Sequence, residues 1–565
     1  AGPPVETEEK NLTPEQLAAG WRLACRRRVL RDEVVHVPDS SLFGGGHQIC
    51  TDHETGAAGG WDPEVRQAPV TMSRPGLEDG TPDLPRMDAA LRESGAMDPA
   101  LPPLAAAPDT LNRLVASLRD GGRAGTAVFR GNTLVDFHPG TDTAPSFGMA
   151  FDIGTTTLAG ALLDLRDGAE RAVASCLNPQ TLHGDDVLSR IALASRGAGE
   201  LRLLRDTVLD AVGELARELC RNAGADPESV HFAAFAGNTT MEHLLCGIDP
   251  SPLGMVPFVP VFGDELDLSA RELRLPVHPE ARALVFPVIG GFVGGDTVAG
   301  LLATELAERE GVTVFVDIGT NGEIVVAHGG KLLAASTAAG PAFEGARISC
   351  GMRAAAGAVE KVLIDGGVRL GVIGGGDPAG LCGSGLIDLC GQLLKAGLLQ
   401  PDGRLPAPDE LPPDTPPEVA AHFMRDADGA PFFRLGGGDG AVFGLTQRDV
   451  RELQLAAGAI RAGIAILLRQ AGLSVDDVTR VLVAGGFGSF IRRDNAQRVG
   501  LLPPELPHDR IQFVGNASLA GAKWAVLSRQ ARARAGEIAR NTRHIELGSD
   551  PDFAMEFAMA MYFPG

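Results

Sequence analysis

The chain has 565 residues, of which 44% are hydrophobic, and its mean hydropathy of +0.06 is typical of a globular protein. That length exceeds what one hydrophobic core supports, so we expect several structural units. With 72 acidic and 50 basic side chains the formal net charge is −22, which disfavours nucleic acid and anionic membranes as partners. Any phosphate site must therefore use backbone amides, helix ends and a metal ion rather than a basic patch.

The eight cysteines are spread along the chain without a CxxC pair or a dense framework. Such spacing is typical of reduced thiols, so we expect a cytoplasmic protein. The most apolar window, residues 284–303, is interrupted by glycines and by Asp296. This interruption predicts that the window does not span a membrane.

The N-terminal portion predicts no complete domain. Residues 1–37 indicate one short helix and one strand, the end of a domain, and residues 38–65 are a glycine-rich linker. The linker contains four side chains of metal-ligating type: His47, Cys50, Asp52 and His53. Since no second group of ligands follows them, we expect no functional metal site there.

Residues 66–146 predict a small α/β domain. They contain a strand interrupted by prolines, two helical segments near 86–94 and 108–121, and two apolar strands joined at Arg130-Gly131-Asn132. From residue 147 to the end, strands and helices alternate, as in a layered α/β domain. One helix there has a clear start, because Thr446 and Asp449 have the spacing of an N-terminal capping box.

One stretch occurs twice in this C-terminal part. FGMAFDIGTTTLAGALLDL (147–165) and VFVDIGTNGEIVVAHGGKL (314–332) each predict two apolar strands joined by a polar turn. Each first strand ends in Asp-Ile-Gly-Thr, which places Asp152 and Asp317 at the end of a sheet. Amides and hydroxyls of such turns bind phosphate oxygens, and a carboxylate beside them suits Mg²⁺. One copy alone would be an ordinary turn, but two matching copies predict a clamp on the phosphates of one nucleotide.

Three further segments are rich in small residues. After a buried strand, VLVAGGFGSF contains three glycines that let a flat ligand approach the backbone. These are Gly485, Gly486 and Gly488. Residues 290–308 predict a small-residue helix that begins near Asp296, and residues 514–525 predict another. Taken alone, such helices are equally typical of close packing.

The order and spacing of these segments across residues 147–565 resemble the superfamily of sugar kinases, heat-shock chaperones and actin. That resemblance implies an α/β fold with two actin-like lobes, each a mixed five-stranded sheet flanked by helices, which close on Mg-ATP. Lobe one is expected at about 147–310 and lobe two at about 311–565.

A closer resemblance is to the reductive activators of corrinoid proteins. The similar stretches are GNTTMEHLLCGIDPSPLG (237–254), LCGSGLIDL (381–389), LTQRDVRELQLAAGAIRAGI (445–464) and the ending FAMAMYFP. This resemblance implies an ATP-dependent iron–sulfur protein that returns an inactive Co(II) corrinoid to Co(I), the methyl-accepting state. Its partners would be the corrinoid protein of a methyltransferase system, an unidentified electron donor and a second copy in a homodimer, with neither nucleic acid nor membrane.

That family has an N-terminal plant-type [2Fe–2S] ferredoxin domain, a linker, a small middle domain and the two-lobed ATPase. By analogy, residues 1–37 are the remnant of the ferredoxin domain, and residues 66–146 are the middle domain. GWRLAC resembles the segment with the fourth cluster ligand, which would be Cys25. The other three ligands, in C-x₄-C-x₂-C spacing, are not in this sequence, so we expect the cluster only in a longer full-length protein.

The resemblance also implies roles for individual residues. Asp152 and Asp317 would hold hydrated Mg²⁺, and Asp296, with Glu323 as the second choice, would position the hydrolytic water. Glu344 would reach the ribose of ATP. The turns would contact the phosphates through Gly154, Thr155, Thr156, Gly319, Thr320 and Asn321, and the three glycines Gly485, Gly486 and Gly488 would contact the adenosine.

Two other functional classes stay open. A small-molecule kinase would use the same clamp, with a substrate hydroxyl in place of water and Asp296 as its base. A chaperone-like or actin-like module would use ATP only to switch the binding of a partner. Stimulation of ATP turnover by a sugar or an acid would favour the kinase, and partner release without a redox effect would favour the module.

Overall fold

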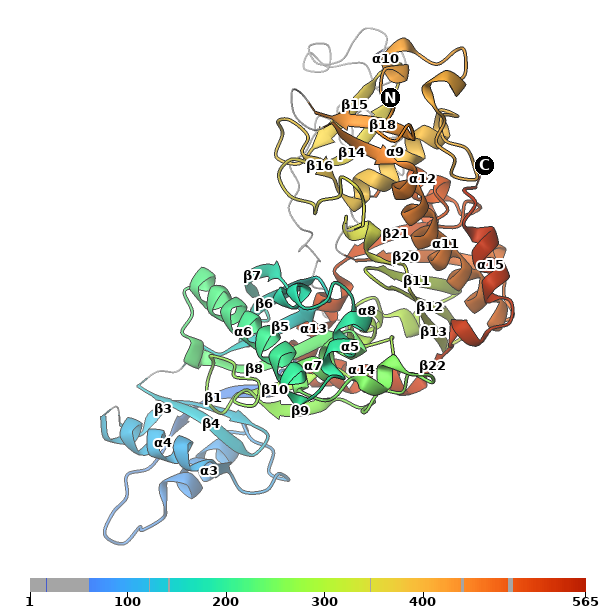
Figure 1. Ribbon diagram of the computed structural model, residues 1–565. Coiled ribbons are helices and arrows are strands. Elements are labelled where there is room, and N and C mark those ends of the chain that lie inside the picture. Colours follow the sequence, from blue (N-terminus) through green and yellow to red (C-terminus); the bar gives the residue numbers. More distant parts are fainter. Residues whose placement is uncertain are drawn as a thin grey trace. The chain divides into compact units, whose positions relative to one another are not determined.

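The computed structural model describes Leu17 and residues 60–564, except residues 121, 141–142, 346, 438–441 and 486–490, and only the backbone of Asp120 and Pro341. Residues 46–565 belong to one compact unit, whose described part is drawn in Figure 1. Several predictions fall outside the described residues: those for the helix and strand of residues 1–37 (Leu17 excepted), for the linker up to residue 59 and for Cys25, Gly486 and Gly488.

The first part of the described chain is a four-stranded sheet with two helices, ordered β1-β3-β4-β2. Its elements are β1 (Val65–Thr71), α3 (Asp83–Glu93), β2 (Ala105–Ala106), α4 (Pro108–Asp120), β3 (Ala124–Arg130) and β4 (Thr133–Pro139). The predicted hairpin is confirmed, since Arg130 pairs with Thr133, and Gly131 turns the chain with a φ of 56° that favours glycine. The sheet and helices enclose their own apolar core, which includes Met87 and Phe129.

The next sheet has six strands in the order β7-β6-β5-β8-β10-β9. Its strands are β5 (Phe147–Ile153), β6 (Thr157–Asp164), β7 (Glu170–Leu177), β8 (Val230–Gly237), β9 (Leu266–Ser269) and β10 (Arg282–Val285). β5, β6 and β7 are antiparallel neighbours, whereas β5, β8 and β10 run parallel. All eight residues of β8 are buried, as expected for a central strand covered on both faces. The helices α5 (Val187–Ala194), α6 (Ala198–Ala223) and α7 (Thr239–Cys246) follow within this part, and α6 contributes Leu204 and Leu215 to the core of one face.

A second six-stranded sheet has the order β21-β20-β11-β12-β13-β22. Its strands are β11 (Val312–Ile318), β12 (Gly322–His328), β13 (Lys331–Thr337), β20 (Val478–Ala484), β21 (Ile511–Gly515) and β22 (Thr542–His544). β11, β12 and β13 are antiparallel, and β11, β20 and β21 are parallel. The helix α11 (Gln447–Gln470) contributes many apolar side chains to the core of this sheet. Its predicted capping box is confirmed, because the Thr446 N–H donates to Asp449 and the Asp449 N–H donates to the Thr446 hydroxyl.

The two six-stranded sheets share one plan of five strands, a three-stranded antiparallel meander followed by two parallel strands. The expectation of five strands in each sheet is wrong by one, because each sheet gains an edge strand at a different end. β9 adds antiparallel to β10 in the first sheet, and β22 adds parallel to β13 in the second. These additions have four and three residues, too few for an alternating apolar pattern to be recognised in the sequence.

Two small-residue helices, α8 (Gly295–Ala303) and α13 (Ala517–Leu527), lie between the two sheets (Figure 1). One hydrophobic cluster contains residues of both helices together with Phe232 of the first sheet and Phe315 of the second. The helices approach closely, since a Cβ on Gly521 would lie 2.0 Å from the Ala299 carbonyl oxygen. The small residues predicted for both helices are therefore required by this contact.

The remaining described elements extend or cover the second sheet. A three-stranded sheet combines β14 (Ala358–Ile364), β15 (Val368–Val372) and β16 (Gly380–Leu381), and another combines β17 (Phe423–Arg425), β18 (Pro431–Gly436) and β19 (Phe443–Thr446). The helices are α9 (Gly383–Lys395), α10 (Pro417–Ala420), α12 (Arg493–Arg498), α14 (Arg529–Asn541) and α15 (Phe553–Ala560). Buried residues of both small sheets, such as Val362 and Phe433, belong to the same apolar core as the second six-stranded sheet.

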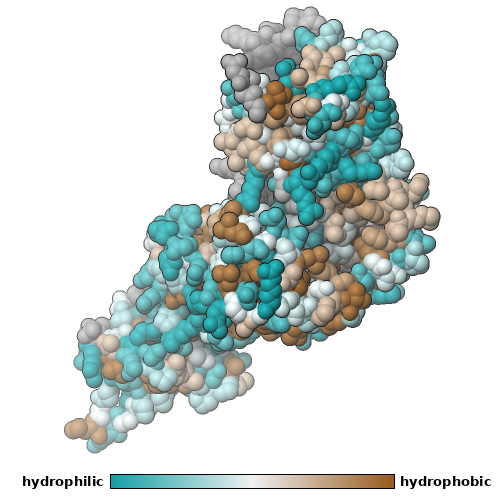
Figure 2. Space-filling view, viewed as in Figure 1, coloured by the Kyte–Doolittle hydropathy of each residue, from teal (hydrophilic) through white to brown (hydrophobic). Residues whose placement is uncertain are grey.

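On the face drawn in Figure 2, hydrophobic residues form small separate groups among hydrophilic ones. None of the helices in the described part of the chain combines the length and the apolar character that a transmembrane segment requires.

Candidate functional site

The two repeated turns occupy the same position in their sheets. Residues 154–156 connect β5 to β6, and residues 319–321 connect β11 to β12. Asp152 lies beside Ala236 of the parallel strand β8, and Asp317 lies beside Ala484 of the parallel strand β20. In open α/β sheets ligands bind at the carboxyl ends of parallel strands, so both turns are placed where a ligand is expected.

One carboxylate connects the two turns. The Thr156 hydroxyl donates to Oε2 of Glu344, and the Thr320 hydroxyl donates to Oε1 of the same group at 2.5 Å. Glu344 lies at the end of a short 3₁₀ helix, Pro341–Glu344, that follows β13. The structure therefore brings the predicted threonines and Glu344 together, and it places an anion with two acceptor oxygens between turns that belong to different sheets.

Four predicted carboxylates gather near the turns. Burial, Asp296 and Asp152 raise the pKa of Asp317 to about 8. Burial and Asp152 raise the pKa of Asp296 to about 7. Burial, Asp296 and Asp317 raise the pKa of Glu323 well above its usual value. Among the described residues none of the four forms an ion pair, so this cluster of acids has no cationic side chain to balance it.

Residues that the sequence analysis did not select complete this cluster. Asn516 Nδ2 and Ser518 Oγ donate to the two oxygens of Asp152 at 2.8 and 2.9 Å, from the start of α13. Glu242 of α7 accepts the Gly237 N–H at 3.2 Å, and burial and Asp296 raise the pKa of its carboxyl. The sequence of residues 514–525 predicts only a small-residue helix. No local pattern distinguishes Asn516 and Ser518 from ordinary residues at a helix start.

Gly485 also lies at this site. Its φ is 109°, and a Cβ there would lie 2.4 Å from the Ile318 carbonyl oxygen and 3.2 Å from Oδ1 of Asp317. Only glycine fits against the second turn at this position.

The first turn rests on a buried arginine. Arg190 of α5 is fully buried, and its Nη2 donates to the Thr155 carbonyl oxygen at 2.6 Å. Its other donors bond to neutral acceptors, the Gly184 carbonyl oxygen and Gln180 Oε1, both at 3.1 Å. Burial lowers the pKa of Arg190 to about 10, so the guanidinium is still cationic at neutral pH. Among the described residues it has no ion-pair partner, so a positive charge is available beneath the turn.

We expect Arg190→Met to lower both anion binding and stability. The substitution removes the buried charge and leaves the carbonyl oxygens of Thr155 and Gly184 without this donor, at a cost of about 1–3 kcal/mol for each group left unpaired. Thermal denaturation and nucleotide titration measure the two effects. Arg196→Met, at an exposed position just after α5, is the matched control and should change neither.

The acid cluster makes stability depend on pH. In the unfolded chain carboxyl groups ionise near pH 4, whereas Asp296 and Asp317 have a pKa of about 7 and 8 in the folded state. Between those values the folded protein binds more protons than the unfolded one, so the free energy of unfolding falls as the pH rises. These two groups alone would lower the free energy of unfolding by about 4 kcal/mol from pH 6 to pH 8 without ligands, measured by denaturant titration. Asp317→Asn should make this fall smaller, and a fall that is unchanged in the variant would contradict the proximity of these acids.

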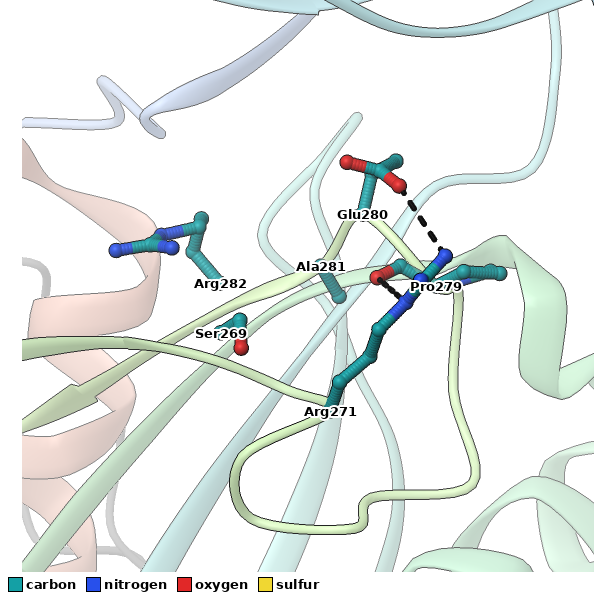
Figure 3. Close-up of a pocket in the computed structure, with 6 residues that line it drawn as sticks. All are labelled: Ser269, Arg271, Pro279, Glu280, Ala281 and Arg282. Atoms are coloured by element: carbon teal, nitrogen blue, oxygen red, sulfur yellow. Dashed lines mark hydrogen bonds and ion pairs between the residues drawn. The ribbon is translucent and has the colours of Figure 1, made fainter. Parts of the chain in front are cut away.

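A separate surface pocket lies along β9 and β10 (Figure 3). Its lining residues are Ser269, Arg271, Pro279, Glu280, Ala281 and Arg282. Arg271 bonds to the Pro279 carbonyl oxygen and to Glu280, and Arg282 bonds to Asp267 at 2.9 Å. Both arginines already have acceptors, so this pocket offers less to an anion than the paired turns do.

Comparisons with known proteins identify the family. The chain matches three family models, the RACo linker region over residues 55–144, the RACo middle region over 147–309 and the C-terminal ASKHA domain of RACo over 311–565. It is 36% identical to the corrinoid activation enzyme RamQ of Eubacterium limosum, over 77% of this chain and 74% of that protein. It is 26% identical to the [Co(II) methylated amine-specific corrinoid protein] reductase of Methanosarcina barkeri, over 70% of this chain and 72% of that protein.

A solved structure agrees with these matches. The reductive activator for the corrinoid, iron–sulfur protein superposes with a TM-score of 0.80 at 33% identity, covering 99% of this chain and 90% of that one. The resemblance stated from the sequence is thereby confirmed. The chain belongs to the RACo family, the reductive activators of corrinoid proteins.

Proposed function

We propose that this chain binds Mg-ATP between its two repeated turns and uses ATP hydrolysis to drive the reduction of a corrinoid protein from Co(II) to Co(I). The single observation that supports this most is the convergence of Thr156 and Thr320 on one anion, the Glu344 carboxylate. A phosphate group offers the same acceptor oxygens to the same hydroxyls. The two sheets would then act as the lobes of an actin-like ATPase, and both contain the same five-strand plan.

The turns would hold the phosphates from opposite lobes. Thr155, Thr156, Thr320 and Asn321 would donate hydroxyl and amide hydrogens, and Gly154 and Gly319 would allow the phosphates to approach the backbone. Arg190 would add a buried positive charge behind the first turn, which partly offsets the net charge of the protein. Gly485, Gly486 and Gly488 would provide the flat surface for adenosine.

The acid cluster fits a divalent cation. Four carboxylates with pKa values raised by burial and by one another, and without a cationic side chain among the described residues, are stabilised when a cation approaches. Asp152 and Asp317 would hold hydrated Mg²⁺, since this hard ion prefers carboxylates and retains its waters. When bound, Mg²⁺ supplies neutralisation of the charge on the phosphates.

Water positioning falls to Asp296, with Glu323 as the second choice. Asp296 lies in the first turn of α8, where its Oδ1 accepts the Thr297 N–H at 2.7 Å and keeps the carboxylate in one orientation. Its pKa of about 7 suits a group that accepts a hydrogen bond from water at neutral pH. The Glu323 carboxylate is fixed by the Ser336 hydroxyl at 3.2 Å, one strand away.

Glu344 must leave the threonines when phosphates arrive, because the carboxylate and a phosphate compete for the same donors. Released from both turns, its carboxylate would be free to accept a hydroxyl of the ribose. Nucleotide binding would thus exchange one contact between the lobes for another and alter the arrangement of the lobes.

The coupling to redox chemistry follows from linkage. The corrinoid substrate gains one electron, and ATP makes this favourable only if the nucleotide states differ in their affinity for, or geometry with, the corrinoid protein. We propose that lobe closure is this two-state element and that the electron comes from a [2Fe–2S] donor. ATP-bound and ADP-bound states would dock the corrinoid differently.

The test mixes the protein with a Co(II) corrinoid protein, a low-potential reductant and Mg-ATP. The Co(I) absorption band should grow only when ATP can be hydrolysed, and a non-hydrolysable analogue is the control. Growth of the band without nucleotide would overturn the coupling. ATP turnover that responds to a small hydroxyl compound and not to the corrinoid protein would instead identify a kinase.

A further inference from the structure

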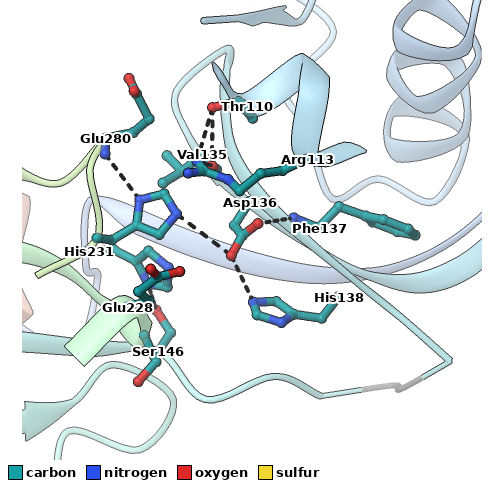
Figure 4. Close-up of polar contacts among 12 residues, drawn as sticks. Thr110, Arg113, Val135, Asp136, Phe137, His138, Ser146, Glu228, His231 and Glu280 are labelled. Atoms are coloured by element: carbon teal, nitrogen blue, oxygen red, sulfur yellow. Dashed lines mark hydrogen bonds and ion pairs between the residues drawn. The ribbon is translucent and has the colours of Figure 1, made fainter. Parts of the chain in front are cut away.

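Three histidines gather around Asp136, at residues that the proposed ATP site does not use. Asp136 and His138 lie on β4 and His231 lies on β8 (Figure 4). His278 lies in the loop between β9 and β10. The cluster thus joins the four-stranded sheet to the first six-stranded sheet.

The ligand atoms are close to one another and shielded from water. One atom each from Asp136, His231 and His278 lie within 4.8 Å of one another. His231 and His278 are each 1% exposed, and the carboxylate of Asp136 is 16% exposed. His278 Nε2 lies 3.7 Å and His138 Nε2 lies 3.3 Å from Oδ2 of Asp136. Ligand atoms about 2 Å from a tetrahedral ion lie roughly 3.3 Å apart, so these side chains would move toward one another when an ion binds.

The imidazole nitrogens facing the centre lack hydrogen-bond partners. Within the described part of the chain, Nε2 of His138, His231 and His278 are all buried without a hydrogen bond. On the far side of the His231 ring, Nδ1 lies 2.9 Å from the Ser146 hydroxyl. A ring whose Nδ1–H donates to Ser146 presents the lone pair of Nε2 to the centre, which is the usual support of a metal-bound histidine. A buried nitrogen left unpaired costs about 1–3 kcal/mol, and an ion would remove that cost.

The charges of the cluster suit a cation. Its three candidate ligands are two imidazoles and one carboxylate, and a third imidazole, that of His138, lies beside the carboxylate. Arg113 is the nearby cation, and its guanidinium faces the Thr110 hydroxyl and the Val135 carbonyl oxygen. Neutral imidazoles and one carboxylate are the forms that ligate metals.

We propose that Asp136, His231 and His278 bind one divalent transition-metal ion of the Zn²⁺ type, with His138 or water completing the coordination. Two imidazoles and a carboxylate suit Zn²⁺ and Co²⁺ rather than Mg²⁺. His278 must change tautomer, since its Nδ1 accepts the Glu280 N–H at 3.1 Å and its Nε2 therefore carries the hydrogen before the ion binds. When the ion binds Nε2, this proton moves to Nδ1, and the contact with Glu280 opens.

A bound ion would link two parts of the structure. β4 belongs to the small sheet, whereas β8 and the His278 loop belong to the first lobe, where the His278 N–H donates to the Val230 carbonyl oxygen. Coordination would connect the four-stranded sheet to the first six-stranded sheet. The bound ion would therefore stabilise the protein against heat without a direct role at the turns.

The experiment titrates the full chain with Co²⁺ and then with Zn²⁺ after treatment with a chelator. Because His47, Cys50 and His53 also offer donor atoms, they are first replaced by alanine. We expect one equivalent of Co²⁺ with visible d–d absorption, displacement by Zn²⁺, and a higher melting temperature with either ion. Failure to bind one equivalent would overturn the proposal without the need for any further variant.

Substitutions then locate the ion. Asp136→Asn and His231→Gln should abolish binding, and Ser146→Ala should weaken it about tenfold by freeing the His231 ring. Asp494→Asn is the matched control, because it also removes a carboxylate beside a histidine, His508 at 3.0 Å. Binding that persists at full strength in both Asp136→Asn and His231→Gln would show that the ion lies elsewhere and that the cluster is only a hydrogen-bonded network.

Discussion

Asp317→Asn will abolish the ATP-dependent formation of the Co(I) corrinoid while the protein still folds. At neutral pH the Asp317 carboxyl holds a proton because its pKa is about 8, and asparagine has nearly the same shape as that protonated form. With Mg-ATP the carboxylate must be charged, and asparagine cannot supply that charge. We expect the rate to fall about 100-fold or more, as for the loss of one electrostatic contact in other active sites. Stopped-flow spectroscopy of the corrinoid measures this rate.

The same variant should be more stable than the unsubstituted protein above about pH 8 in the absence of nucleotide. There the Asp317 carboxyl is ionised and repels Asp296 and Glu323, and asparagine removes that repulsion. Glu310→Gln, an exposed acid just before β11, is the matched control and should alter neither rate nor stability. Full activity of Asp317→Asn would disprove the metal-holding role, whatever its stability.

Glu344→Ala should bind ATP more tightly, with a Kd about tenfold lower. In the nucleotide-free protein, phosphates have to displace a carboxylate that accepts a hydrogen bond from each turn, and such charge-assisted bonds contribute about 1.5–3 kcal/mol. Alanine removes both the competitor and its negative charge. Calorimetric titration with Mg-ATP gives the affinity.

Thr320→Val provides the contrast to Glu344→Ala. This change also breaks the contact with Glu344, but it removes a hydroxyl that the phosphates would use, so we expect weaker ATP binding. If Glu344→Ala also weakens ATP binding, the Glu344 carboxylate stabilises the ATP-bound state, through the ribose, more than it stabilises the nucleotide-free state. Opposite signs for the two variants would establish the competition.

The local parts of the site could be predicted from the sequence. Each Asp-Ile-Gly-Thr stretch contains the end of a strand, a turn and an acid within a few residues. The apolar pattern and the glycine are therefore enough to predict that Asp152 and Asp317 lie at strand ends. The capping box at Thr446 is equally local. By contrast, the edge strand β22 is three residues long, and its pairing with β13 depends on where the preceding helices place it.

The supporting residues could not be predicted because their roles depend on long-range contacts. Ser518 and Asn516 look like ordinary residues at a helix start until the structure places them on Asp152. Arg190 looks like a surface arginine of an amphipathic helix, yet it is fully buried beneath Thr155. For Glu344, a resemblance gave a role at the ribose, and only the coordinates show that both turns bond to it.

The contact between Asp152 and Asn516 spans 364 positions of the chain. During synthesis the first sheet therefore emerges with its Asp152 carboxylate lacking two of its donors until the last segment has left the ribosome. A polypeptide that stops before α13 would retain both repeated turns but would lack this helix, which lies between the two sheets. A product truncated in this last segment would lack Asn516 and Ser518, and we expect it to bind nucleotide more weakly than the whole chain.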